Sequence, residues 1–419
     1  MTESDWDDHD PSEEELDELA RRRAIWQSTG NPCAFWPSLE PHMIQAAADV
    51  IGRAVADMLR DSHATLHAET IDAEALGVAA LLSGVGPLLG YWMERGALET
   101  SDAARPVLAR HLRHASARSA RIDAGMRPVL ARLSALGITP AAIKGFHTAR
   151  EYFPAPETRP FGDVDLVVHP EEVARVEAAL REAGFVAAGG RDLPYKRDWK
   201  PPRHDGRVRS FHVWHAQGNW KVELHAGLAF DHLIDHKLQL DRVIDMSERW
   251  EMQGVPLRAP SGPSLVAMLA VHASGELYSS RLLRLVELVL VIRHERAAGR
   301  LDWRDVSERL ANIGALRFAY PAFALVERLA PGTVDEGLVA RTASASSALA
   351  RRVVDGFTPT SPILELSTSL PLRLMWVMTA RETAHRVWRM IAPPRGEPLG
   401  TVLRVYHSRL RRLITGAAR

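Results

Sequence analysis

The chain has 419 residues, and its 52 lysines and arginines balance its 52 aspartates and glutamates, for a formal net charge of zero. Whole-molecule electrostatics therefore give no argument for a nucleic acid or a membrane as partner, and a charged ligand has to be met by a local patch. Because Cys33 is the only cysteine, an intramolecular disulfide and a zinc site made of cysteines are excluded. The length suits two or three domains of about 100 to 200 residues each.

The N-terminal end of the chain is strongly acidic. Residues 1–18 (MTESDWDDHDPSEEELDE) contain no basic, apolar signal sequence, so we expect a cytoplasmic protein. We predict that residues 1–30 form a solvated acidic tail leading into an exposed helix over EEELDELARRRAIW. Acids at the start of this helix and arginines towards its end suit the helix dipole.

A helical region is predicted over residues 31–121, where apolar side chains recur at spacings of three and four. Its longest uncharged run, from Ala75 to Met93, approaches the length of a membrane span. Two glycines and a proline interrupt this run, so we expect buried helices there and no membrane partner.

The pattern changes near Ile122, and residues 122–250 predict a small mixed sheet with helices. In chain order this segment contains a helix, a short strand (ITPAAI), a helix (FHTAREYF), a strand (DVDLVV) and a helix (PEEVARVEAALREAG). Two further strands, RSFHVWH and NWKVELHAGL, are expected to form an antiparallel hairpin across AQG. Residues 251–419 predict a C-terminal helical domain. The expected fold class is therefore α+β, with a small mixed-sheet core flanked by N-terminal and C-terminal helical regions.

Two aspartates in GDVDLVV are the first candidates for a functional site. Side chains alternate along a strand, so Asp163 and Asp165 share one face while Val164 and Leu166 face the other. Two carboxylates this close repel each other unless a cation lies between them, so the pair favours a divalent metal ion. The bare DxD pattern also occurs on ordinary surface strands, and its interpretation depends on the surrounding sequence.

Three features around the aspartates favour a site. Lys144 and Gly145 lie where an apolar strand meets a helix, an arrangement that turns backbone amides towards phosphates. Glu223, in the predicted strand WKVELH, can supply a third carboxylate. Arg159 precedes the strand DVDLVV closely and offers a guanidinium for bidentate contact with a triphosphate.

The order of these motifs resembles an uncharacterised bacterial nucleotidyltransferase family of the DNA polymerase beta superfamily. The resemblance rests on the KG turn, a short helix, an arginine before DVDLVV, a helix ending in AGF and a later VELH, and it covers residues 138–228. RLLRLVELVLV and the later LDWRDV are similar to the helical C-terminal part of that family. The segment 122–250 is accordingly expected to be a nucleotidyltransferase core.

The resemblance implies that Asp163 and Asp165 hold two magnesium ions, or manganese, and that Glu223 binds the metal at the attacking hydroxyl. It also implies that Lys144 neutralises phosphate charge and that Gly145 lets the backbone approach the phosphates. The superfamily more usually has Gly-Ser at this turn, whereas Lys-Gly is similar to this particular family. The expected reaction moves a nucleoside monophosphate from ATP or another nucleoside triphosphate to an acceptor and releases pyrophosphate. A small molecule, peptide or protein suits a neutral chain better as acceptor than a nucleic acid does.

Other functions compete with this interpretation. The scaffold can bind a nucleotide or a partner without turnover, as a regulatory module, because a fold alone does not prove activity. A hydrolase is a weaker alternative, since no Ser-His or Cys-His arrangement supports it. His232 and His236 (HLIDH) have the spacing of two zinc ligands on a helix, but the glutamate of HExxH is missing.

Histidines and arginines elsewhere also have two interpretations each. His212, His215 and His225 fall in the predicted hairpin, where His225 either orients Glu223 or belongs to an ordinary polar face. The segment TVLRVYHSRLRRLI near the C-terminus predicts a helix with one apolar stripe. We favour packing of that stripe over a docking face for an anionic partner.

Overall fold

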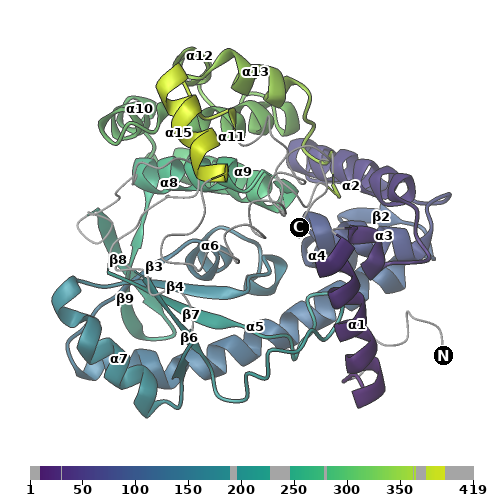
Figure 1. Cartoon of the computed structure of the whole chain (residues 1–419), viewed down its shortest axis with the longest axis horizontal. Coiled ribbons are helices and arrows are strands. Elements are labelled where there is room, and N and C mark those ends of the chain that lie inside the picture. Colours follow the sequence, from purple (N-terminus) through teal and green to yellow (C-terminus); the bar gives the residue numbers. More distant parts are fainter. Residues whose placement is uncertain are drawn as a thin grey trace.

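The computed structural model describes residues 10–29, 31–188, 196–226, 246–277, 281–361, 363–364 and 374–391. Helices dominate the N-terminal part of the chain (Figure 1). They are α1 (Glu13–Thr29), η2 (Pro32–Phe35), α2 (Pro41–Asp61), α3 (Ala73–Ser83), α4 (Gly86–Glu94) and α5 (Ala104–Ala135). Two short strands, β1 (Ala64–Leu66) and β2 (Leu98–Thr100), pair in parallel among these helices.

The longest apolar stretch of this region is broken in the middle. Asp72 caps α3 by accepting a hydrogen bond from the Ala75 amide, and Gly84 ends this helix with a φ of 77°. No single described helix is long and apolar enough to cross a membrane. The helices α3 and α4 reach that length and apolarity only as a pair, which is bent by 112° at the break.

A seven-stranded mixed sheet occupies the middle of the chain. Its strands are β3 (Ala141–Ile143), β4 (Asp163–Val167), β5 (Val186–Ala187), β6 (Lys196–Lys200), β7 (Lys221–His225), β8 (Ser247–Met252) and β9 (Val255–Pro260). They lie in the order β5-β6-β7-β4-β3-β9-β8, with the pairs β4–β7 and β3–β9 parallel and the other pairs antiparallel. The intervening helical segments are α6 (Gly145–Glu151), η3 (Pro156–Thr158), η4 (Pro170–Glu172) and α7 (Val173–Glu182).

Helices return after the sheet and form a layer above it in the view of Figure 1. They are α8 (Gly262–Gly275), α9 (Arg281–Ala297), α10 (Trp303–Asn312), α11 (Leu316–Leu329), α12 (Glu336–Ala345), α13 (Ala348–Asp355) and α15 (Ala380–Ile391). The α+β class with a mixed-sheet core and flanking helical regions is thereby confirmed.

Two hydrophobic clusters hold these parts together. One lies on the sheet face that carries Val164 and Val222, against Met126 of α5 and Leu180 of α7. The other unites the N-terminal helices with the C-terminal helices, so the two flanking regions share one core. Burial of apolar area in both clusters supplies the main driving force for this arrangement.

Element boundaries differ from the predicted division of the chain. The helix α5 runs without a break across residue 121. Residue 250 lies within β8, which pairs with β9, so the sheet continues past the predicted boundary to Pro260. One long helix therefore belongs both to the N-terminal region and to the layer under the sheet. The division into four units stays a prediction.

The predicted hairpin of RSFHVWH with NWKVELHAGL is wrong. Residues 209–215 form no strand, and β7 pairs instead with β6 and β4. Groups of the expected strand have partners elsewhere: the Phe211 carbonyl accepts from Trp36 Nε1 at 2.9 Å, and His212 lies 3.3 Å from Glu74. Tertiary contacts therefore override an alternating pattern of residues.

The first helix is less exposed than predicted. Leu16 and Leu19 are 5% and 3% exposed. The Arg22 guanidinium donates to the Phe35 carbonyl at 3.2 Å. The helix α1 is therefore packed against its neighbours and is not a plain solvated segment.

Candidate functional site

Strand register brings the carboxylates of two distant segments together. In the parallel pair β4–β7, Asp165 lies opposite Glu223 and Asp163 lies opposite Lys221. On the other side of β7, Asp198 of β6 lies opposite Glu223. Because Val164 and Val222 point into the core on the opposite face, the alternation of each strand gathers the charged side chains on one face of the sheet.

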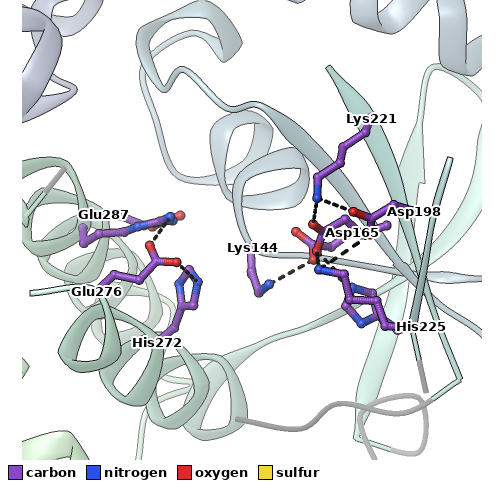
Figure 2. Close-up of polar contacts among 11 residues, drawn as sticks. Lys144, Asp165, Asp198, Lys221, His225, His272, Glu276 and Glu287 are labelled. Atoms are coloured by element: carbon purple, nitrogen blue, oxygen red, sulfur yellow. Dashed lines mark hydrogen bonds and ion pairs between the residues drawn. The ribbon is translucent and has the colours of Figure 1, made fainter. Parts of the chain in front are cut away.

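Asp165 has two basic neighbours at one oxygen. Its Oδ1 accepts from Lys144 Nζ and lies against His225 Nε2, both at 2.9 Å, and the side chain is 1% exposed (Figure 2). Burial alone favours the neutral acid, but Lys144 and His225 outweigh it and hold the pKa of Asp165 well below its usual range. Asp165 is therefore an ionised, buried carboxylate.

Glu223 is held by lysines from two strands. Lys196 Nζ and Lys221 Nζ each lie 2.5 Å from one of its oxygens, and Lys221 also contacts Asp198 at 2.6 Å. Burial opposes ionisation here too, yet His225, whose Nε2 lies 3.7 Å away, and the two lysines lower the pKa of Glu223 to about 2. The carboxylate stays ionised at neutral pH.

Asp163 differs from the other two acids. Among the described residues it makes no hydrogen bond or ion pair, and its side chain is partly exposed. Burial raises its pKa to about 6, and the negative charges of Asp165 and Glu223 add to the shift. Asp163 thus has no ion-pair partner among the described residues, and a bound cation would stabilise its ionised form.

The donor atoms suit a divalent metal ion. Ligand atoms of Asp165, Glu223 and His225 all lie within 4.8 Å of one another. Burial lowers the pKa of His225, but the carboxylates of Asp165 and Glu223 outweigh it and raise this pKa overall. Carboxylate oxygens are the donors that magnesium and manganese prefer, and Asp163 offers a further one on the same sheet face.

Lys144 lies at a turn between strand β3 and helix α6. Its backbone has φ 52° and ψ −137°, a region that side chains rarely adopt. Figure 2 shows its ammonium between the strand-borne acids and a second charged group on α8 and α9. Thr148 Oγ1 donates to the Lys144 carbonyl at 2.9 Å, which ties the turn to the first part of α6.

Arg159 has a different partner from the one expected. Its guanidinium donates to both oxygens of Glu287 on α9, at 3.0 and 2.9 Å, and the residue is 2% exposed. It also packs on Gly145, where an added Cβ would lie 2.9 Å from Phe161 Cβ. The small size of Gly145 therefore makes room for Arg159 and Phe161. In this arrangement Arg159 packs against the turn that carries Lys144 and Gly145.

The second charged group was missed in the sequence. Arg284 Nη2 donates to Glu276 at 2.7 Å, and His272 Nε2 lies 3.4 Å from the same carboxylate. Arg284 also interacts electrostatically with Asp163, and Glu276 with Lys144. The helical spacing of RLLRLVELVLV predicts its apolar face, but nothing in it signals that Arg284 faces the acids.

Arg118 of α5 fixes the chain on the approach to β7. It donates to the carbonyls of Gly218 and Asn219, both at 2.7 Å, and lies over the ring of Trp214. Burial lowers its pKa to about 10. Because Arg118 also reaches the Phe161 carbonyl at 3.4 Å, it links the segments that lead into both acid-bearing strands.

Other predicted sites lie elsewhere. His212 contacts Glu74 at 3.3 Å, and the ring of His215 lies 4.7 Å from that of His114. The pair His232 and His236 and the arginine-rich segment TVLRVYHSRLRRLI lie outside the described residues. Of the three histidines in the expected hairpin, His225 is the one that contacts the acids.

Comparison with known proteins places the chain in a family. No curated protein matches it. The solution structure of the antibiotic-resistance factor ANT(2'')-Ia is similar over 47% of this chain and 96% of that chain, at 13% identity and a TM-score of 0.28, which is too low to support an argument. The family model described as uncharacterised nucleotidyltransferase matches residues 69–331, well over half of the 419 residues. The resemblance of the motifs is thereby confirmed, and the chain belongs to the uncharacterised nucleotidyltransferase family.

Proposed function

We propose that this protein is an active, metal-dependent enzyme that transfers a nucleoside monophosphate from a nucleoside triphosphate to an acceptor and releases pyrophosphate. One observation carries the proposal: Asp165 and Glu223 are register partners on one sheet face, and Asp163 shares that face. Three carboxylates gathered on one face, two of them held ionised by neighbouring cations, form the oxygen-rich site that two-metal phosphoryl transfer needs.

The residues divide the work by position. Asp163, Asp165 and Glu223 would hold magnesium or manganese with oxygen donors. When bound, these ions would activate the acceptor hydroxyl and offset the charge that develops on the transferred group and on pyrophosphate. Lys144 binds phosphate oxygens, since its ammonium lies beside Asp165 and its side chain is 15% exposed.

We expect Glu223 to be the carboxylate that contacts the acceptor. Lys196 and Lys221 hold it ionised and fix both of its oxygens. It can therefore accept a hydrogen bond from the acceptor hydroxyl and orient it. We expect a small molecule, a peptide or a protein as acceptor rather than a nucleic acid, because the net charge of the chain is zero.

A non-catalytic nucleotide-binding module is the alternative. The two functions differ in turnover, so the test is incubation of the full chain with each nucleoside triphosphate labelled at the α-phosphate, magnesium or manganese, and cell extract. The proposal expects label on an acceptor and unlabelled pyrophosphate. Stabilisation by nucleotide and metal without any labelled acceptor would favour the binding module.

Asp163→Asn tests the site itself, with Asp198→Asn as matched control on the same sheet face. Burial and the charges of Asp165 and Glu223 disfavour the ionised form of Asp163, so Asp163→Asn is expected to fold with equal or slightly higher stability. It should lose the rise in melting temperature that magnesium and nucleotide give together, and transfer of label should fall to background. Asp198→Asn should keep both. Unfolding of Asp163→Asn would show that the aspartate pair is structural and would overturn the proposal, whereas an unchanged metal response would place the metal site elsewhere.

A further inference from the structure

The cations around the KG turn are not equally available to a ligand. Arg159 is 2% exposed, and its guanidinium makes two hydrogen bonds to Glu287. Its donors are therefore committed within the protein. A triphosphate carries several negative charges, and Lys144 offsets only one of them, so a second side-chain cation near the acids would add to the charge that metal ions neutralise.

Arg284 on α9 has the properties that Arg159 lacks. Its side chain is 19% exposed, so solvent reaches it. Of its five N–H donors, one contacts Glu276 at 2.7 Å, whereas the nearest approach to Glu287 is 3.8 Å, which is too long for a hydrogen bond. Its Nε is buried and has no hydrogen-bond partner within the described part of the chain. Arg284 therefore keeps spare N–H donors at a position that is largely buried but still open to solvent.

Arg284 and Lys144 share the same charged neighbours. Both cations interact electrostatically with Asp163, and both interact with Glu276. Figure 2 shows Lys144 between the strand-borne acids and the helix-borne group to which Glu276 belongs. A polyphosphate that contacts Lys144 is thus flanked by α9 on the side away from the sheet.

We propose that Arg284 is a binding residue for the β- and γ-phosphates of the nucleotide and acts together with Lys144. This inference rests on the proposed function and extends it, because it makes the C-terminal helices part of the nucleotide site. A planar guanidinium with free N–H groups matches phosphate oxygens bidentately.

Inorganic tripolyphosphate with magnesium is the probe, because it has the phosphates of the nucleotide without its base or sugar. Calorimetric titration of the full chain should show that Arg284→Met binds this probe about 10- to 100-fold more weakly than the wild type. Affinity for a nucleoside monophosphate should change by less than about twofold, since Arg284 faces the outer phosphates. Arg296→Met, on the same helix, is the matched control, because the hydrogen bonds of Arg296 within the described part of the chain go to the carbonyls of residues 332 and 333.

The double variant Arg284→Met with Glu276→Gln guards against misfolding, because removing both partners leaves no buried charge unpaired. It should show the same selective loss. Equal affinity of Arg284→Met and wild type for tripolyphosphate would overturn the role of Arg284, and so would equal losses for tripolyphosphate and monophosphate. A wild-type protein that binds neither tripolyphosphate nor any nucleoside triphosphate would instead overturn the proposed function.

Discussion

Replacement of Arg159 by methionine tests whether this residue supports the fold or the ligand. Arg159 and Glu287 form a buried pair whose side chains are 3% and 1% exposed. Removing the arginine leaves a buried carboxylate with Thr148 as its remaining close partner. Breaking such a pair costs about 3–5 kcal/mol. The urea dependence of the unfolding free energy is about 1–3 kcal/mol per molar for small proteins and rises with chain length, so in this chain the unfolding midpoint should fall by about 1 M.

Two further variants give this experiment its controls. Arg132→Met removes one partner of the exposed pair Arg132–Glu182, whose side chains are 48% and 56% exposed, and should change stability by less than about 1 kcal/mol. Arg159→Met combined with Glu287→Met should lose less than Arg159→Met alone, because no buried charge is left. If Arg159→Met unfolds at the wild-type midpoint but loses tripolyphosphate binding, the phosphate role expected from the sequence is right and the structural role is refuted.

Three more predictions concern other parts of the fold. Gly145→Ala should lower the melting temperature, because the new Cβ would lie 2.9 Å from Phe161 Cβ; an unchanged temperature in a calorimetric scan would show that the turn has room. Leu19→Ala should cost about 2–5 kcal/mol, whereas Ile25→Ala on the same helix, where the residue is 46% exposed, should cost little in urea unfolding. Burial lowers the pKa of His147 to about 3 from 6.5, so the unfolded chain takes up a proton that the folded chain refuses. Stability should therefore fall as the pH drops from 6.5 towards 3, by about 1.4 kcal/mol per pH unit from this group. Melting temperatures of His147→Phe should depend less steeply on pH between 7 and 5, and an equal slope would contradict the assignment.

Local pattern was enough to predict the strand that carries the two aspartates. Alternation in GDVDLVV places Asp163 and Asp165 on one face and valines on the other, and the structure has this arrangement. The parallel pairing of this strand with β7 was beyond the sequence, because the two partners are separated by other elements and strand pairing is non-local. The strand β6 (KRDWK) was missed because four of its five residues are charged, as in a solvated segment. Of its side chains, that of Trp199 belongs to the hydrophobic cluster under the sheet.

The candidate site was predictable in its acids and less so in its cations. The carboxylates of Asp165 and Glu223 come together as expected, and Lys144 joins them. What these residues bind stays a prediction. Arg159 was linked to phosphate because it precedes the aspartates closely, but its partner Glu287 lies 128 positions away in sequence. A contact of that separation depends on how α9 packs over the turn, which composition and periodicity do not encode.

The backbone of Lys144 implies a conflict between stability and activity at one position. A φ of 52° with a ψ of −137° suits glycine, and a residue held in such a sparsely populated region costs about 1–3 kcal/mol. The chain nevertheless has a lysine there, directly after strand β3, and its ammonium lies 2.9 Å from Asp165 Oδ1. Selection for a sturdier protein would favour glycine at this turn, and selection for a positive charge beside the acids would oppose it. Homologues that have glycine at this position should therefore either take the charge from another element or have given up the chemistry.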